Sequence, residues 1–419
     1  MKMQNTLIQR VQTISAELNS RFRQRSEVIE CMLASMIAGE LVLLLGPRGE
    51  AKTAIVEALA EYITGGTHFS VGLAKSSTPD DILGGVDVVA LQNGTYTRNV
   101  NGFLPTATTF LLDEGFKSNN PTLQALLRVL SEREFQGVKI PAIFGAIASN
   151  ELPPELRGQK GGKSADLGPF EDSLLAFYDR FFHKLEVQPL EAGTDDWNSV
   201  IFDNVSDSRN VKITATVTPE EIRQLQKTVR DISIPEAVKD AIRKLAISLA
   251  DQKTNVHVST RTWRKAIRVL QAHAWLAGRN AVQRTDLKWL EYALWTTPDQ
   301  KLVIRAAIAQ LSSVEVQEAN AAKIKASQYF SAYQKQKLAN MTTGEAKGLT
   351  CMNDEVSNIM HAAVQEPFVI WLKNMTTELM QLEPEPEDAS VISGNIYIIE
   401  TIRKSVMADM MKRLKGVMS

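Results

Sequence analysis

The sequence predicts an α/β fold that continues into helical regions, and three observations support this prediction. Apolar runs such as residues 41–45 and 109–112 have the length and composition of strands buried on both faces, as in a parallel sheet. Segments with helical spacing of apolar residues separate these runs. Residues 218–290 read as helical throughout, and residues 300–419 are also rich in helical patterns.

Composition limits the class of protein. A chain of 419 residues is long enough for two or three domains, and 44% apolar with 23% charged residues is typical of a soluble globular protein. The net charge of −1 gives no bulk attraction to nucleic acid or to an anionic membrane, and no stretch approaches a membrane span. Neither Cys31 and Cys351 nor the five histidines show a disulfide or metal-ligand spacing. We therefore expect a reduced, cytoplasmic protein.

The first chemical motif follows the strand predicted at residues 41–45. Two helices over residues 6–38 precede this strand, and a helical segment over residues 54–62 follows the motif. A buried strand, a glycine-containing turn, Lys-Ser/Thr and a helix are the components of a loop that binds phosphates and magnesium, although an ordinary turn is the alternative. The motif consists of Gly46, Pro47, Arg48, Gly49, Glu50, Ala51, Lys52 and Thr53.

Two residues of this loop depart from expectation. Ala51 stands where the pattern G-x-x-x-x-G-K-[ST] has its last glycine, and we predict helical dihedrals there because only a positive φ demands glycine. Glu50 would repel phosphates if its carboxylate faced them, so we expect the side chain to point outward.

The second motif is a pair of acids, Asp113 and Glu114, at the end of the apolar run Thr109–Leu112. Downstream of a phosphate-binding loop, such acids can hold magnesium and polarise a water molecule. A solvated acid pair at a strand end is the alternative. Between the two motifs, a second strand is predicted at residues 67–73, and residues 86–98 alternate around Asn93-Gly94 as in a hairpin.

Three further polar residues are candidates for the same site. Asn150 ends a buried strand predicted at residues 141–149, where it either orients water near a γ-phosphate or simply terminates the strand. Arg180 lies between aromatic residues and is either a surface ion-pair residue or an arginine presented to a neighbouring subunit's nucleotide. Arg261 lies in the first turn of a helix, where a cation is unfavourable unless an anion is nearby.

These motifs appear in the order seen in AAA+ ATPases. Within that superfamily, the chain resembles the MoxR family. The segments GPRGEAKT, STPDDILGG, NGFLP before TTFLLDE, and STRTWRKAIRVLQAHAWLAGRNAV carry the resemblance, which covers residues 6–295. Within the family, the chain is most similar to the RavA branch. The resemblance implies a three-layer αβα core, an all-α lid and a helical C-terminal region.

The resemblance also implies roles for individual residues. Lys52 and Thr53 correspond to Walker A, Asp113 and Glu114 to Walker B, and Asn150 to sensor 1. Arg180 corresponds to the arginine finger and Arg261 to sensor 2, with ATP and Mg²⁺ as cofactors. The predicted hairpin near residues 92–98 corresponds to the family's insertion in the nucleotide domain.

At the level of the whole protein, the resemblance implies a ring, usually a hexamer, with ATP between protomers. It also implies chaperone-like remodelling of a protein client, often with a von Willebrand factor A-domain partner. The predicted domains are residues 1–190 for the nucleotide, 191–217 as a polar linker, 218–299 as the lid, and 300–419 for docking or ring contacts.

Two other hypotheses remain open from the sequence. A nucleotide-gated scaffold would hydrolyse ATP slowly and bind a partner enzyme or defence effector through residues 300–419, and Arg48 and Glu50 favour it. A nucleic-acid motor fits poorly with the net charge, although residues 157–163 are locally basic.

Overall fold

The structure is a computed structural model. It describes residues 2–153, 169–202, 213–251, 254, 256–311, 318, 321–332, 366–382 and 389–417. The basic segment at 157–163 lies outside these residues. By contacts, the chain divides into two units: residues 1–190 with 204–307, and residues 191–203 with 308–419. The four predicted domain boundaries stay a prediction.

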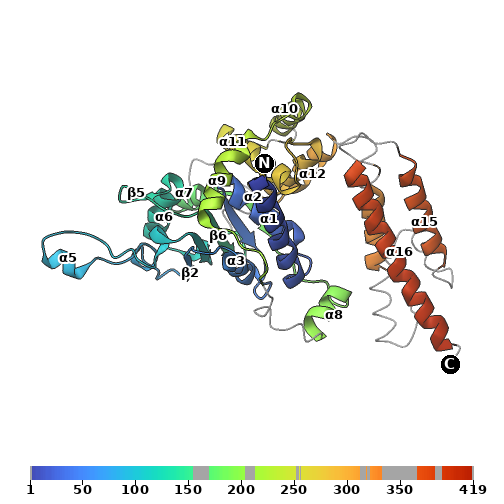
Figure 1. Ribbon diagram of the computed structural model, residues 1–419, viewed down its shortest axis with the longest axis horizontal. Helices are drawn as coiled ribbons and strands as arrows, with labels where there is room; N and C mark the ends of the chain where they lie inside the picture. The colour runs from blue at the N-terminus through green and yellow to red at the C-terminus, as the bar shows by residue number, and fades with distance from the viewer. Residues whose placement is uncertain are drawn as a thin grey trace. The chain divides into compact units, whose positions relative to one another are not determined.

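The first unit is built on a sheet of five parallel strands in the order β2-β3-β6-β1-β7 (Figure 1). Every residue of β1 and β6 is buried, which is why both run as uninterrupted apolar or small residues. The strands are β1 (Leu41–Leu45), β2 (His68–Gly72), β3 (Thr109–Asp113), β6 (Phe144–Ser149) and β7 (Phe181–Glu186). A separate antiparallel pair consists of β4 (Glu134–Phe135) and β5 (Val138–Lys139).

Helices pack against this sheet and complete the αβα core. Helix α2 contacts β1, β6 and β7, α3 contacts β3 and β6, and α1 lies beside α2 (Figure 1). Helices of the nucleotide-binding region are α1 (Lys2–Arg21), α2 (Ser26–Ala38), α3 (Lys52–Glu61), α4 (Asp80–Leu83), α5 (Val88–Gln92), α6 (Asn120–Glu132) and α7 (Pro169–Tyr178). Short 3₁₀ turns are η1 (Leu104–Thr106) and η2 (Gly115–Lys117).

The described residues between 218 and 290 are mostly helical, as predicted. A capping box starts the first of these helices: the Thr218 hydroxyl accepts from the Glu221 N–H, and Glu221 accepts from the Thr218 N–H. The elements are α9 (Pro219–Thr228), η5 (Val229–Asp231), α10 (Glu236–Ala250), α11 (Thr260–Leu276), η6 (Arg284–Tyr292) and α12 (Gln300–Ala309). Helix α11 packs against α2 and also contacts β7, so the lid helices share a core with the sheet.

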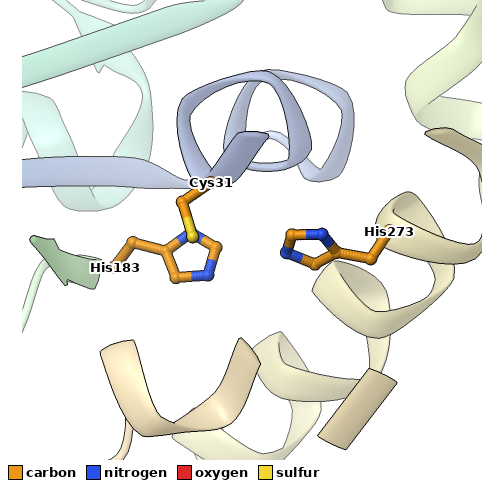
Figure 2. Close-up of side chains that lie close together, drawn as sticks. All are labelled: Cys31, His183 and His273. Carbon is orange, nitrogen blue, oxygen red and sulfur yellow. The ribbon is translucent and has the colours of Figure 1, made fainter. Parts of the chain in front are cut away.

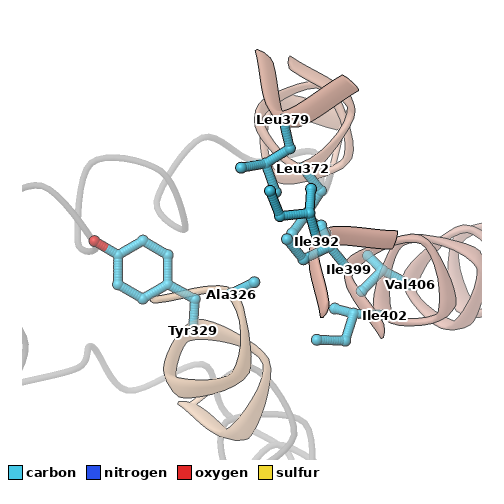
Figure 3. Close-up of a cluster of buried hydrophobic side chains, with 8 residues drawn as sticks. All are labelled: Ala326, Tyr329, Leu372, Leu379, Ile392, Ile399, Ile402 and Val406. Carbon is cyan, nitrogen blue, oxygen red and sulfur yellow. The ribbon is translucent and has the colours of Figure 1, made fainter. Parts of the chain in front are cut away.

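The second unit contains a helical hairpin of α15 (Glu366–Met380) and α16 (Ala389–Val417). An apolar cluster joins these two helices to residues 321–332, which are also helical (Figure 3). The cluster consists of Ala326, Tyr329, Leu372, Leu379, Ile392, Ile399, Ile402 and Val406. The prediction of helical packing for this region is confirmed for the residues described.

Two local predictions were wrong. Residues 88–92 form the short helix α5, capped by the Asp87 carboxylate, and only a single bridge between Val86 and Arg98 remains of the predicted hairpin. The Asp87 side chain accepts from the N–H groups of Val89 and Ala90, so local capping replaces strand pairing. The connection predicted as irregular over 189–217 contains helix α8 (Asp195–Phe202).

Candidate active site

The phosphate-binding loop, residues 46–51, connects the end of β1 to the start of α3. A Cβ at Gly46 would lie 2.2 Å from the Val187 carbonyl oxygen, so only glycine fits against the residue that directly follows β7. The helix that begins at Lys52 directs its free N–H groups at the loop, which is the usual arrangement for binding phosphate.

The prediction for Ala51 was wrong. Its backbone has φ 61° and ψ 18°, which is left-handed and not helical. An L-residue with a Cβ costs about 1–2 kcal/mol in this region, whereas glycine does not. The loop therefore carries strain at the residue immediately before its lysine.

Lys52 is held inside the loop. Its Nζ donates to the carbonyl oxygens of Gly46 and Pro47, both at 2.7 Å, and lies 3.4 Å from Asn150 Oδ1. Burial lowers the pKa of Lys52 from its usual value, while Asp113 and Glu114 act in the opposite direction. The ammonium group thus lies between the loop and the polar ends of β3 and β6.

Thr53 and Asp113 meet at the position expected for a magnesium ion. The Thr53 hydroxyl donates to Asp113 Oδ2 at 2.9 Å, which joins the start of α3 to the end of β3. A hydroxyl and a carboxylate are hard oxygen ligands of the kind that Mg²⁺ prefers. The donor set present here therefore fits the ion.

Glu114 is adjacent to this pair and has a distinctive backbone. Its φ of 53° and ψ of 39° turn the chain at the end of β3. Asn150 Nδ2 donates to Glu114 Oε1, and Lys117 Nζ lies 3.1 Å from the same oxygen. The other oxygen, Oε2, is buried and has no hydrogen-bond partner among the described residues. Glu114 and Asn150 line a cleft of about 550 Å³ beside the loop, so one carboxylate oxygen is held and the other is left for a ligand.

Glu50 is paired with a residue that sequence reasoning missed. Its carboxylate lies 3.2 Å from the guanidinium of Arg25, which precedes α2. The Glu50 side chain is 22% exposed, so it neither faces fully outward, as expected, nor remains unpaired. Arg25 also lines a cleft of about 260 Å³, together with its neighbours at 24 and 26–28 and with Glu186, Gln188 and Pro189. Nothing local in the sequence indicates this contact, because the two residues are 25 positions apart.

Arg180 and Arg261 lie together, but away from the loop. Arg180 immediately precedes β7, and Phe181 is in register with Leu41, the first residue of β1. The loop follows the last residue of β1, so the two sites are separated by a strand length of roughly 13 Å or more. Burial lowers the pKa of Arg180, and the positive charge of Arg261 acts in the same direction.

The two arginines line a basic cleft of about 500 Å³ at the amino ends of the strands. Glu40 is the only acid among its lining residues, and it is 3.1 Å from Lys265 and 2.5 Å from Arg268. The cations that line the cleft are Arg133, Arg180, Arg261, Arg264, Lys265 and Arg268. Six cations against one acid make this cleft suited to anions. Arg133, Arg264, Lys265 and Arg268 were not predicted, since their clustering depends on tertiary packing.

The geometry therefore divides the predicted residues into two groups. Lys52, Thr53, Asp113, Glu114 and Asn150 contact one another at the carboxyl ends of the strands. Arg180 and Arg261 form the second group at the amino ends. None of the helices in the described part of the chain is long and apolar enough to cross a membrane.

Two regions of the chain match known protein families. Residues 9–159 match the MoxR domain found in MoxR-vWA-beta-propeller ternary systems. Residues 237–308 match an AAA lid domain.

Two relatives by sequence and one solved structure are similar to most of the chain. Two uncharacterized proteins of Methanocaldococcus jannaschii are each 28% identical, over 72% and 73% of this chain and 76% of their own length. A crystal structure of a candidate ATPase from Cytophaga hutchinsonii superposes with a TM-score of 0.55 at 18% identity, covering 74% of this chain and 95% of that one. The MoxR match over residues 9–159 and the AAA lid match over residues 237–308 together support placing these two regions in the MoxR family of AAA+ ATPases.

Proposed function

We propose that the chain hydrolyses ATP at a site shared between protomers of a ring, and that it uses this reaction to remodel a protein client. The proposal rests on two observations. Five residues form a contact network at the carboxyl ends of the strands: Lys52, Thr53, Asp113, Glu114 and Asn150. Arg180 and Arg261 lie at the amino ends of the strands in the same sheet. One chain supplies all the components, but it does not bring them to one place.

The carboxyl ends of the strands bind and orient the nucleotide in this proposal. Backbone N–H groups of residues 46–53 and the Lys52 ammonium contact the phosphates. Thr53 and Asp113 would hold Mg²⁺, which neutralises charge on the phosphates during transfer. Glu114 accepts a hydrogen bond from the attacking water through Oε2, while Asn150 keeps Oε1 in place.

The basic cleft supplies the missing positive charge from a neighbouring protomer. Arg180 would contact the transferred phosphoryl group, and Arg261 would act beside it. Both are in a cleft lined by six cations, where burial and repulsion favour an incoming anion. Contacts of this kind join chains head to tail, as in a ring, and a hexamer is the form that we propose.

A protein client and a von Willebrand factor A-domain partner are proposed on the family match. The matched MoxR domain is the one found in systems that contain such a partner. Membership of the RavA branch, a cytoplasmic location and a docking role for residues 300–419 stay predictions.

The rival hypothesis is a scaffold that binds ATP and hydrolyses it slowly. Arg48 and Glu50 were the features in its favour, and the pairing of Glu50 with Arg25 reduces the repulsion that Glu50 would exert on phosphates. Turnover far below about one per second, with or without partners, would favour the scaffold.

The experiment measures ATPase rate and particle mass together, with and without ATP. Replacing the base in Glu114→Gln should lower turnover by about 10²–10⁴-fold while ATP still binds. Glu132→Gln, at an exposed acid on α6, is the matched control and should leave turnover unchanged. Full turnover in Glu114→Gln would refute the assignment, and rings without turnover in the unmodified protein would favour the scaffold.

A further inference from the structure

Three potential metal ligands meet in the core of the first unit. They are Cys31 on α2, His183 on β7 and His273 on α11, and one ligand atom from each lies within 4.8 Å of the other two (Figure 2). Cys31 and His183 are fully buried, and His273 is 1% exposed. The residues are far apart in the sequence, so no spacing pattern revealed them.

Hydrogen bonds fix both imidazoles in the orientation that metal-binding histidines adopt. The Ser35 hydroxyl lies 2.7 Å from His183 Nδ1, and the Glu30 carboxylate lies 3.3 Å from His273 Nδ1. Metal-bound histidines usually engage their second ring nitrogen in this way, with a hydroxyl, a carbonyl or a carboxylate. Figure 2 shows the two rings as neighbours, with the Cys31 sulfur beside the His183 ring, and the ring planes meet at 77° in an edge-to-face arrangement.

The remaining nitrogens have no hydrogen-bond partner. His183 Nε2 and His273 Nε2 are both buried and unpartnered among the described residues. A buried polar atom without a partner is costly, and two such atoms in one cluster with a thiol need an explanation. His273 also stacks on Trp289, with ring centroids 4.4 Å apart and planes at 3°, which holds its ring in place. Packing alone would account for the stack but leaves both nitrogens unexplained.

The protonation states suit ligation. Burial lowers the pKa of both imidazoles, that of His273 to about 3, so each ring is neutral and offers a lone pair. Burial also raises the pKa of the Cys31 thiol, so the thiol must give up its proton when a metal–sulfur bond forms. Binding therefore releases one proton to solvent for each ion taken up.

We propose that Cys31 Sγ, His183 Nε2 and His273 Nε2 bind one thiophilic ion of the zinc and monovalent copper class. A thiolate with two imidazoles selects these ions over magnesium or calcium. With metal–sulfur and metal–nitrogen bonds of about 2.3 and 2.0 Å, ligand atoms stand roughly 3.5 Å apart, so the three side chains must close by about 1 Å. The site is separate from the magnesium ligands, Thr53 and Asp113.

The ion would cross-link the side chains of three elements that are otherwise connected only by the backbone and by non-covalent packing. Helix α2 and strand β7 belong to the core of the sheet, whereas α11 is the helix that carries Arg261. A bond network through the ion would hold α11 against β7 at residues 183 and 273.

The test uses full-length protein without a histidine tag. A Cys351→Ser background leaves Cys31 as the only thiol, because the sequence has two cysteines. Since the site is buried, the metal is supplied during expression, as zinc in one culture and cobalt in another. We expect one zinc or cobalt ion per chain by elemental analysis of the respective cultures. Cobalt protein should show a sulfur-to-cobalt charge-transfer band.

Single substitutions then assign the ligands. Cys31→Ala should lose the charge-transfer band, and His273→Asn should lower metal content by about 10-fold or more. His257→Asn, at an exposed histidine, is the matched control and should keep both signals. If the variants fail to fold, thermal unfolding of the background protein decides, because bound zinc must raise its midpoint above that of the chelated protein. A metal-free background protein, or a band that persists in Cys31→Ala, would refute the proposal.

Discussion

The two ends of the central sheet carry opposite chemistry. At the carboxyl ends of β1, β3 and β6, one lysine lies among two acids, an amide and a hydroxyl that already contact one another. At the amino ends of β1 and β7, six cations surround a cleft in which Glu40 is the only acid. The side chains at the carboxyl ends are of the kinds that bind magnesium and phosphate. The cations at the amino ends can stabilise the negative charge of a phosphate group, but they cannot bind the metal.

This difference teaches which parts of the reaction one chain can perform alone. Binding and water activation depend on side chains within hydrogen-bond reach of each other, and these lie at one end of the sheet. Charge stabilisation by Arg180 requires contact with the phosphoryl group, which the length of β1 prevents within the chain. A second chain is the direct way to bring the two ends together.

Arg180→Ala gives the largest expected effect on this comparison. Loss of the proposed arginine finger should lower turnover by about 10³-fold or more while ATP still binds, because in the proposed site the guanidinium would contact only the neighbour's phosphoryl group. Turnover and ATP binding are measured separately. Arg230→Ala, at an exposed arginine on η5, serves as the control.

A mixture of Arg180→Ala and Lys52→Ala chains sharpens this prediction. Each variant is inactive alone, but an interface that pairs an intact loop with an intact arginine regains the complete set. Partial recovery of turnover on mixing is the expected result. No recovery in mixed assemblies of confirmed composition would contradict a shared site.

Arg261→Ala should have a smaller effect. Arg261 lies in the first turn of α11, and its side chain lines the same cleft as Arg180. Its loss should lower turnover by about 10–100-fold, because one charge-assisted contact is removed. Arg264→Ala removes a cation from the next turn of the same helix and serves as the matched control. Equal losses for the two variants would mean that the cleft acts through total charge and that Arg261 has no specific role.

Ala51→Gly tests strain at the carboxyl ends of the strands and has the smallest effect. Relief of the left-handed alanine should raise the free energy of unfolding by about 1 kcal/mol, as measured by denaturant titration. Ala54→Gly, in the first turn of α3, should lower it by about 1 kcal/mol, because glycine weakens a helix. Destabilisation by both changes would show that the Ala51 backbone is not strained.

Local patterns predicted most of the sheet and one half of the site. Buried strands are short apolar runs, and parallel strands end at the same edge, so Thr53, Asp113, Glu114 and Asn150 could be grouped from the sequence. The helix starts at Thr218 and Ser259 could also be predicted from the sequence, because capping depends on residues that are neighbours in the chain.

Features that depend on distant residues could not be predicted. The left-handed dihedrals of Ala51 reflect how the loop joins β1 to α3, and the sequence shows only an alanine. The pairing of Glu50 with Arg25 and the cluster of Cys31, His183 and His273 depend on how α2 packs. Asp87 overrode the alternation at residues 86–98 by capping a short helix.

If the phosphate-binding loop of one chain and Arg180 of the next complete a site, as proposed, an open row of chains contains one complete site fewer than it has chains. The loop of the first chain has no neighbour that supplies Arg180, and Arg180 of the last chain has no neighbouring nucleotide to contact. Closing the row adds the final site without adding protein, so specific activity should rise with concentration until closure. A single inactive chain that lacks both functions would silence two neighbouring sites, and poisoning by such chains would therefore exceed their fraction in the mixture.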